Sequence, residues 1–163
     1  MNNIKNFFFS FFVFFILFSS HSYSELVKKI EIVGNERISK ETIIVFGDIA
    51  LGKDYEKKDL NAIIKKLYDT TFFSNISTAL ENNKLIITVK ENPIINTITF
   101  DGENAKKYKE KISEIISLRE KSSFIESNIK TDINVIKGFY KVQGNYFVKI
   151  EATVEKLQKN KNE

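Results

Sequence analysis

The chain has 163 residues, no cysteine, one histidine (His21) and a formal net charge of +4. Because His21 falls in a predicted signal peptide, Ser-His catalysis, Cys-His catalysis, disulfides and the usual zinc sites are excluded from the exported chain. Lysines alternate with glutamates and form no basic stripe with aromatic residues, which argues against nucleic-acid binding. With no phosphate loop and no acidic cluster at metal-ligand spacing, we expect neither a cofactor nor enzymatic activity, although catalysis by carboxylates alone stays open.

Residues 1–24 are predicted to be a cleaved secretory signal peptide. Lys5 supplies the positive charge, Phe7–Phe18 form a nearly uninterrupted apolar run, and the small residues Ser22 and Ser24 precede a cut before Glu25. A retained N-terminal anchor is the alternative, but this run is short of the roughly 20 residues that a spanning helix needs. Export without cysteine favours the bacterial periplasm.

The first predicted unit, residues 25–92, opens with a strand from Val27 to Val33, where apolar and polar residues alternate. Gly34 and Asn35 tolerate left-handed backbone and are expected to end this strand. Ser39 suits the N-cap of a short helix, and Gly47 suits its end. Three side chains of this helix are expected to point inward: Ile43, Ile44 and Phe46.

The clearest helical pattern runs from Tyr55 to Thr70, with Asp54 as the expected N-cap. Its apolar residues recur at i, i+3, i+4, i+7 and i+8, so they form one stripe along the helix. Strands are predicted nearby, so packing on a sheet is favoured over a groove-binding or membrane-surface role. The stripe consists of Leu60, Ile63, Ile64, Leu67 and Tyr68.

A hairpin is predicted to close the first unit. Its strands run from Asn75 to Glu81 and from Leu85 to Lys90, and Asn82-Asn83 forms a two-residue turn between them. Asn92-Pro93 marks the boundary of the unit, because proline cannot donate a hydrogen bond to a central ladder. The short junction predicts a limited range of angles between the two units.

The second unit, residues 93–163, is predicted to repeat this order. A strand is expected at Ile95–Asp101, a helix at Ala105–Ser117, a helix opened by a Ser123/Glu126 capping box, and a strand at Tyr146–Val154. Side chains expected to point inward from the two helices are Tyr108, Ile112, Ile115 and Ile116, then Ile125, Ile129, Ile133, Ile136 and Tyr140. A further strand is expected by analogy with the first unit, and the polar tail does not supply it.

Three stretches carry a family resemblance: IEIVGNERIS (30–39), LYDTTFFSNI (67–76) and ENPII (91–95). Together with the signal peptide and the tandem order, they resemble the POTRA repeats of outer-membrane protein assembly factors from Gram-negative bacteria. This resemblance implies an α+β fold of tandem β-α-α-β-β units, each a three-stranded mixed sheet covered by two helices. The second unit departs from that pattern because it lacks its last strand, which is central in this family, and we therefore expect it to be distorted or loosely held.

In that family, the repeats lie in the periplasm ahead of a C-terminal outer-membrane β-barrel. The resemblance implies that they receive unfolded outer-membrane proteins, meet periplasmic chaperones and dock accessory lipoproteins. The barrel is absent from this sequence, which we therefore interpret as an N-terminal fragment. The POTRA region of a two-partner secretion transporter, a division scaffold and a stand-alone periplasmic adaptor stay open as alternatives.

The mechanism implied is β-augmentation, in which an extended client pairs with an exposed strand edge through main-chain hydrogen bonds. The second strand of each unit is the expected edge. The candidate residues are Asn75, Ile76, Ser77, Thr78, Ala79, Leu80 and Glu81 in the first unit, and Tyr146, Val148 and Ile150 in the second. An edge that is merely solvated, with Lys and Asn discouraging pairing, is the alternative for each of these residues.

Overall fold

The structure is a computed structural model that describes residues 25–157. The predicted signal peptide and residue Ser24 of its cut site lie outside the described residues, as does the end of the tail. Within the described range, no helix is long and apolar enough to cross a membrane. The elements in chain order are β1 (Glu25–Leu26), β2 (Lys29–Val33), α2 (Lys40–Gly47), β3 (Asp54–Tyr55), α3 (Lys57–Asp69), β4 (Phe73–Glu81), β5 (Lys84–Glu91), α4 (Lys106–Ile115) and α5 (Ser127–Val142).

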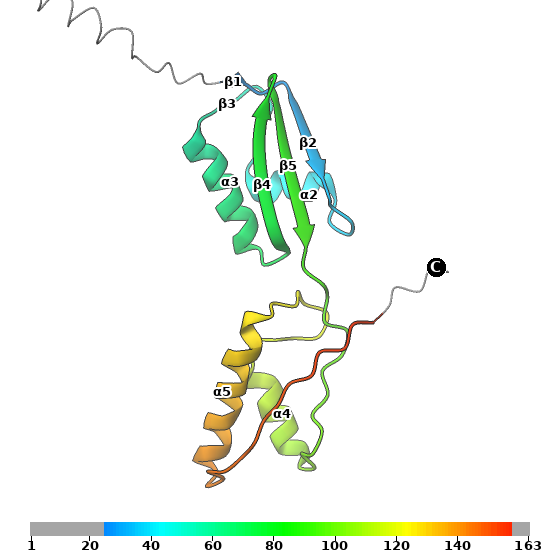
Figure 1. The fold of residues 1–163 in the computed structure, drawn as a ribbon, viewed down its shortest axis with the longest axis vertical. Coiled ribbons are helices and arrows are strands. Elements are labelled where there is room, and N and C mark those ends of the chain that lie inside the picture. The colour runs from blue at the N-terminus through cyan, green and yellow to red at the C-terminus, as the bar shows by residue number, and fades with distance from the viewer. Residues whose placement is uncertain (1–24, 158–163) are drawn as a thin grey trace, which may run out of the picture.

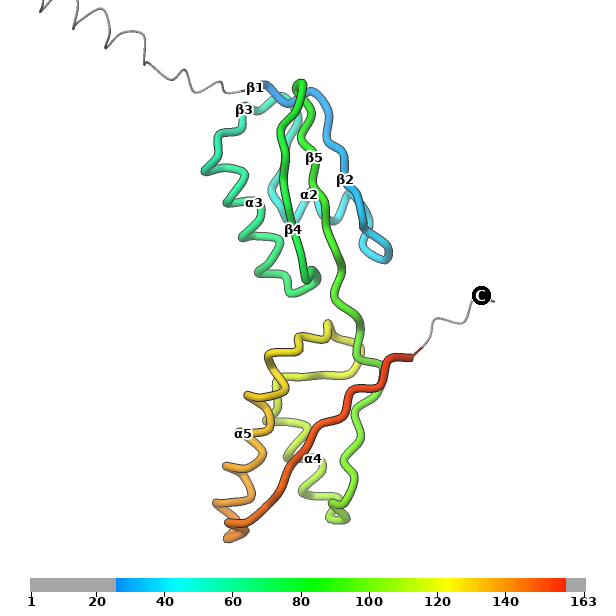
Figure 2. Tube along the Cα trace, viewed as in Figure 1, coloured from blue at the N-terminus to red at the C-terminus, as the bar shows by residue number. Residues whose placement is uncertain are grey.

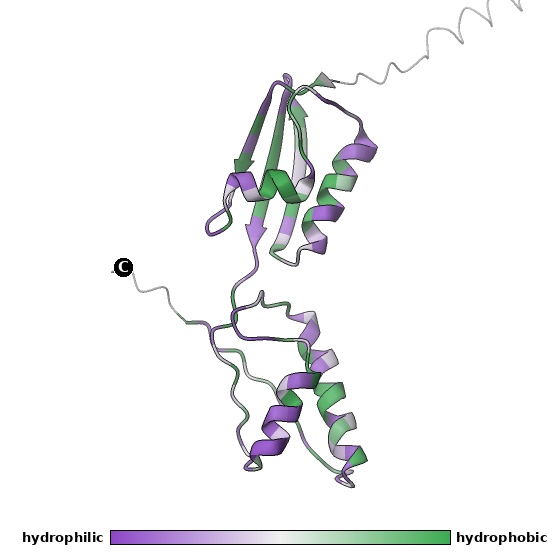
Figure 3. Cartoon of the chain, turned by 180° about the vertical axis from the view of Figure 1, so that it is seen from behind, coloured by the Kyte–Doolittle hydropathy of each residue, from purple (hydrophilic) through white to green (hydrophobic). Residues whose placement is uncertain are grey.

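The first unit is a three-stranded mixed sheet covered by two helices, as predicted. The strand order is β2-β5-β4, with β2 parallel and β4 antiparallel to β5. Helices α2 and α3 lie on one face of this sheet (Figure 1). Seen from behind, α2 crosses the sheet, and the strands beneath it are largely apolar (Figure 3). The last strand of the unit is therefore central, and β2 and β4 are its edges.

Period-two alternation decides which strand residues enter the core. Leu85, Ile87 and Val89 of β5 are buried, whereas Thr88 and Lys90 between and beyond them are exposed. The open face of the sheet is mostly polar, and Lys84 there pairs with Glu31 at 3.0 Å. The buried core cluster comprises Val27, Ile32, Ile43, Ile49, Tyr55, Ile63, Leu67, Phe73, Ile76, Leu85, Ile87 and Val89.

Two predicted turns and one predicted cap are present. Asn82 and Asn83 both have positive φ, at 50° and 63°, as a two-residue hairpin between twisted strands requires. Gly34 has a φ of +85°, and a Cβ on it would lie 2.2 Å from the carbonyl oxygen of Val89. Ser39 caps α2 by accepting a hydrogen bond from the Thr42 backbone N–H at 3.1 Å.

Three details of the first unit differ from the prediction. Residues Val27 and Lys28 precede β2, because the chain first pairs Glu25–Leu26 with β3. Asp54 belongs to β3 and does not cap α3; instead the Asp59 carboxylate accepts from the Glu56 backbone N–H at 2.9 Å. Phe46 is 41 % exposed and lies against Phe72 with the two rings tilted by 46°, because Ile43 and Gly47 are the residues of α2 that are buried in the core.

The second unit contains helices α4 and α5 but no sheet among its described residues. The predicted strands at Ile95–Asp101 and Tyr146–Val154 are wrong: both segments are irregular, apart from a single bridge between Ile94 and Ser123. Figure 2 shows the later segment returning from the far end of α5 as an irregular trace. In the first unit β5 pairs with both β2 and β4, and no strand in residues 93–157 takes that central position. The second unit is therefore distorted, as expected, because its two outer segments have no central strand with which both could pair.

The predicted Ser123/Glu126 capping box is also absent. Glu126 occupies the N-cap position of α5 without a side-chain hydrogen bond, and Ser123 is drawn away by its bridge to Ile94. Asp132 instead connects the two helices, because its carboxylate accepts from the backbone N–H groups of Ser117 at 2.7 Å and Leu118 at 2.9 Å. This aspartate is 5 % exposed, and sequence reasoning had not singled it out.

An aromatic cluster packs the other end of the helix pair. Tyr108 meets Phe139 and Tyr140 edge-on, at ring-centroid distances of 5.2 and 5.9 Å. The Tyr140 hydroxyl donates to the Glu103 carboxylate. Burial, followed by this carboxylate, raises the pKa of Tyr140 to about 12. Of the predicted inward residues, only Ile112 and Ile116 are fully buried, so the packing of this unit is shallow.

Candidate functional site

The outer edge of β4 presents backbone groups that the sheet does not use. Glu81 and Lys84 flank the two-residue turn and face one another across the ladder. In an antiparallel hairpin of this kind the flanking pair exchanges hydrogen bonds, and bonded pairs then alternate along the strands. The N–H and C=O groups of Ile76, Thr78 and Leu80 therefore point away from β5, and those of the residues between them point toward it.

A side-chain contact verifies this direction. The Ile76 backbone N–H donates to the hydroxyl of Tyr68 at 3.2 Å, and Tyr68 belongs to α3 rather than to the sheet. Beyond Ile76, a β-bulge between Phe73 and Asn75 interrupts the ladder. The regular part of the outer edge therefore runs from Ile76 to the hairpin turn.

An apolar row on α3 borders this edge. Leu60, Ile64 and Tyr68 succeed one another at i+4 spacing; the first two are half-buried against the core and Tyr68 is 41 % exposed. From Tyr68 back to Leu60 the helix rises about 12 Å, and from Ile76 to Leu80 the strand advances about 13 Å. Because Tyr68 meets Ile76 and α3 runs alongside β4 in the opposite direction (Figure 1), we expect Ile64 at the level of Thr78 and Leu60 at the level of Leu80. The helix row and the strand edge therefore match in length.

The sequence of β4 does little to prevent pairing. Edge strands are usually protected by lysine, proline, bulges or short length. This strand, FSNISTALE, has neither Lys nor Pro, and its bulge lies at its first residues. The other edge strand, β2, has five residues against nine in β4. The longer and less protected edge is therefore β4.

The predicted site residues of the first unit divide between two faces. Ile76, Thr78 and Leu80 turn their side chains toward the helices, and Ile76 is buried. Asn75, Ser77, Ala79 and Glu81 lie on the open face, where only Ala79 is half-buried. Sequence reasoning had placed Leu60, Ile64 and Tyr68 in the core stripe and had not connected them with the edge. An amphipathic tyrosine at the end of that stripe was the available signal.

The predicted residues of the second unit do not form an edge. Tyr146 is 68 % exposed, Val148 and Ile150 are half-buried, and the segment that holds them pairs with no strand of the described chain. Without a sheet its backbone is not set in a fixed row of donors and acceptors. Of the two predicted docking edges, the described residues therefore form only the one on β4.

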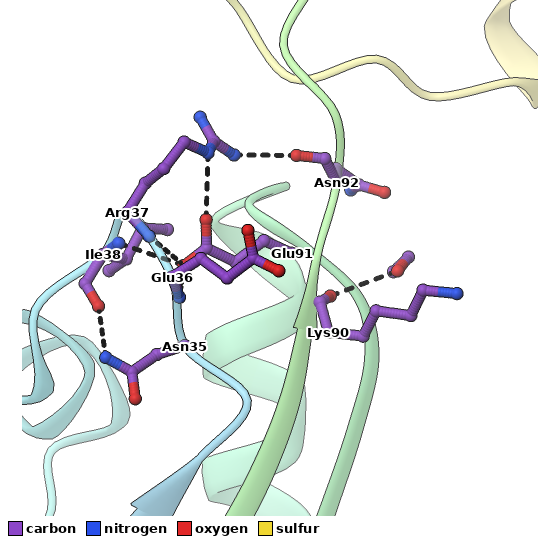
Figure 4. A network of polar contacts seen from close by, with 8 residues as sticks. Asn35, Glu36, Arg37, Ile38, Lys90, Glu91 and Asn92 are labelled. Atoms are coloured by element: carbon purple, nitrogen blue, oxygen red, sulfur yellow. Dashed lines mark hydrogen bonds and ion pairs between the residues drawn. The ribbon is translucent and has the colours of Figure 1, made fainter. Parts of the chain in front are cut away.

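A polar network at the end of β5 joins two stretches far apart in sequence (Figure 4). The Glu91 side chain, 6 % exposed, accepts through Oε1 from the backbone N–H groups of Glu36, Arg37 and Ile38 at 2.8, 2.9 and 3.0 Å. Its Oε2 lies 3.0 Å from Arg37 Nε as an ion pair, without hydrogen-bond geometry. Burial raises the pKa of Glu91, but the three N–H donors and Arg37 outweigh it and leave that pKa lowered.

Asn92 continues this network from β5 into the junction. Its backbone N–H donates to the Phe72 carbonyl at 2.7 Å, and its side-chain amide donates to the Thr71 carbonyl at 2.8 Å. Arg37 donates to the Asn92 carbonyl at 2.8 Å. The loop after β2, the loop before β4 and the end of β5 are thereby fixed together. Among residues 25–157 there is no group of three or more His, Cys, Asp or Glu side chains placed to hold a metal ion.

Comparison with known proteins shows which family and which relatives this chain resembles. The profile of the POTRA family, described as "Surface antigen variable number repeat", matches residues 93–163. The outer membrane protein assembly factor BamA of Neorickettsia risticii is 26% identical over 129 residues, which are 79% of this chain and 17% of that protein. BamA of Neisseria meningitidis is 25% identical over 137 residues, with 83% and 17% covered. Residues 93–163 therefore resemble a POTRA repeat, and most of the chain is similar to the N-terminal part of BamA.

Solved POTRA structures share the fold. The N-terminal domain of Omp85 from Thermosynechococcus elongatus superposes with a TM-score of 0.52 at 15% identity, covering 75% of this chain and 53% of that one. The POTRA1-2 region of Omp85 from Anabaena gives a TM-score of 0.50 at 15% identity, covering 82% and 89%. This chain spans about one sixth of the length of the first BamA relatives, whose matched share is 17%.

Proposed function

We propose that this POTRA chain is the periplasmic arm of an outer-membrane β-barrel assembly factor, and that it binds clients rather than catalysing a reaction. Its repeats would extend over residues 25–92 and 93–163, after a signal peptide that directs export. The BamA relatives support an assembly factor over a secretion transporter or a division scaffold. Docked accessory lipoproteins and chaperones would be its further partners. No cofactor and no nucleic acid enters this function.

The client would bind on the outer edge of β4 by β-augmentation. The observation that carries this proposal is the row of outward backbone groups at Thr78 and Leu80 beside the apolar side chains of Ile64 and Leu60. An extended segment placed there pairs its main chain with β4 and turns every second side chain toward α3. An unfolded outer-membrane β-strand, in which apolar and polar residues alternate, has the matching pattern.

The pairing of a client strand with β4 is expected to be weak enough for transient binding. Each main-chain hydrogen bond contributes about 0.5–1.5 kcal/mol net, because the client gives up bonds to water. The regular edge offers only a few such bonds, and ordering the client opposes them. Main-chain pairing also reads little sequence, so many clients can use the same edge. We therefore expect weak and reversible binding.

The test uses the chain from Glu25 onward and a synthetic peptide of about ten residues that alternates valine with threonine. In Thr78→Pro the outward N–H of the edge is lost without the loss of any bond to β5. We expect peptide-induced shifts of the β4 amide signals in NMR spectra to vanish in this variant. Thr78→Ala is the matched control, because it removes the side chain and keeps the N–H.

Unchanged peptide binding in Thr78→Pro, with the hairpin amides of the free variant otherwise native, would contradict docking at this edge. Loss of binding in both variants would show that the Thr78 side chain is what matters. The hairpin must stay folded for either conclusion, and its amide spectrum without peptide reports that.

A further inference from the structure

We infer that Tyr68 sets the register of the strand that docks on β4. This inference rests on the proposed function and adds to it a residue that decides where pairing stops. The Tyr68 hydroxyl accepts the Ile76 N–H, which is the first outward donor after the bulge. A docked strand that tried to pair at Ile76 would have to displace this hydroxyl. Thr78 and Leu80 have no such competitor in the helix row.

The position of Tyr68 is fixed by its surroundings. It lies in the last turn of α3, and its carbonyl accepts from the Thr71 backbone N–H at 2.9 Å. The Thr70 hydroxyl donates to the Leu67 carbonyl at 2.6 Å, which closes the same turn. Asn92 then holds the Thr71 carbonyl at 2.8 Å. The hydroxyl is therefore presented to the strand edge by a turn that is bonded on both sides.

The hydroxyl of Tyr68 can end the ladder without leaving a backbone donor or acceptor unpaired. A tyrosine hydroxyl can accept one hydrogen bond and donate another. While it accepts from Ile76, its own proton remains for the last carbonyl of a docked strand. Tyr68 thus occupies the place that the next residue of the docked strand would take. The half-exposed ring keeps this group at the border between edge and solvent, where an incoming strand meets it.

The register of a bound peptide can be measured with a photoreactive side chain at successive peptide positions, read by mass spectrometry of the cross-linked β4 residues. With the native chain we expect a single register, in which peptide-induced amide protection covers Thr78 and Leu80 but does not extend to Ile76. In Tyr68→Phe the Ile76 N–H is freed. We expect the bound peptide to shift by two residues along β4, or about 6.6 Å, so that cross-links and protection now reach Ile76.

Tyr146→Phe is the matched control, because it also removes one phenolic hydroxyl but lies in the second unit, away from β4. It should leave the register unchanged. Faster hydrogen exchange at Ile76 in the free Tyr68→Phe chain would verify that the bond is lost.

The outcomes separate the two ideas. A peptide that binds β4 in the same register in the native chain and in Tyr68→Phe, despite faster exchange at Ile76, overturns the role of Tyr68 and leaves edge docking in place. A peptide that makes no cross-link to β4 in the native chain overturns edge docking, and the inference about Tyr68 with it. A two-residue shift that is confined to Tyr68→Phe supports both.

Discussion

At the scale of single residues, Gly34 is required both by the turn after β2 and by the close approach of β5. It lies where the backbone turns left-handed after β2, and at the same point the carbonyl of Val89 on β5 passes so close that a Cβ would meet it at 2.2 Å. Two independent requirements, positive φ and space, fall on one residue. Sequence reasoning had found the first requirement from the Gly-Asn pair. The second depends on a strand that lies more than fifty residues later in the chain.

Gly34→Ala should therefore destabilise the first unit by more than the ordinary strain of a left-handed alanine, which is about 1–3 kcal/mol. The added methyl group pushes β2 and β5 apart in addition to straining the turn. Chemical denaturation, followed by circular dichroism, measures the difference. Gly52→Ala is the control, because Gly52 has a similar φ of +73° and nothing within 4 Å of its Cβ position. Equal losses in the two variants would mean that the contact with Val89 has no energetic weight.

At the scale of elements, Glu91 joins the end of the central strand to the loop that enters α2. The loop 34–39 turns three successive N–H groups toward one carboxylate oxygen, so the charge of Glu91 replaces the hydrogen bonds that this loop cannot make internally. Arg37 adds an ion pair and also reaches the carbonyl of Asn92. Two sequence motifs that looked separate, GNERIS and ENP, are therefore halves of one network.

The lowered pKa of Glu91 predicts a pH dependence. Because its folded-state pKa lies below the ordinary value of 4.5, the ionised form stabilises the fold at neutral pH. That contribution is lost as pH falls through the ordinary value toward the lower folded-state pKa. Glu91→Gln keeps an acceptor oxygen and removes the charge, which should cost about 1–2 kcal/mol at pH 7.

The measurement is the free energy of unfolding from urea titrations at several pH values between neutral and acid. The difference between the native chain and Glu91→Gln should be largest at neutral pH and should shrink below the ordinary carboxyl range. A difference that stays constant with pH would show that size or hydrogen bonding, rather than charge, sets the role of Glu91. Because Glu31, Asp48 and Glu103 also have lowered pKa values, only the difference between the two chains isolates Glu91.

At the scale of the whole molecule, the two units differ in how they are held. Figure 1 shows them joined by the chain that leaves β5. Asn92 is bonded to the first unit, and Pro93 accepts the Phe124 N–H of the second at 2.7 Å, so no free residue separates them. The first unit has a continuous core, while the second has two helices, few buried side chains and exposed apolar residues at Tyr146 and Phe147.

This contrast predicts unequal local stability. Amides in β5 should exchange with solvent only through global opening of the first unit, and amides in α5 should exchange faster through opening of the second. Native-state hydrogen exchange with mass spectrometry resolves the two regions in one experiment. Equal protection of α5 and β5 would mean that the second unit is held as firmly as the first. The absence of a sheet from residues 93–157 would then have little effect on the stability of this unit.

The sequence by itself determined the order of the main elements in the first unit, both helix pairs, the Asn-Asn hairpin and the identity of most core side chains in the first unit. These depend on local periodicity and turn chemistry, which neighbouring residues set. Only the tertiary structure decided that Asp54 pairs in a strand instead of capping α3, and that Ser123 forms a bridge with Ile94 instead of capping α5. It also decided that the alternating segments of the second unit form no sheet. Strand pairing requires a partner, and period-two alternation does not reveal whether the partner is present. The candidate site followed the same division: the edge position of β4 was expected from the family resemblance, whereas its α3 border and the hydroxyl of Tyr68 depend on how a helix and a strand align in space.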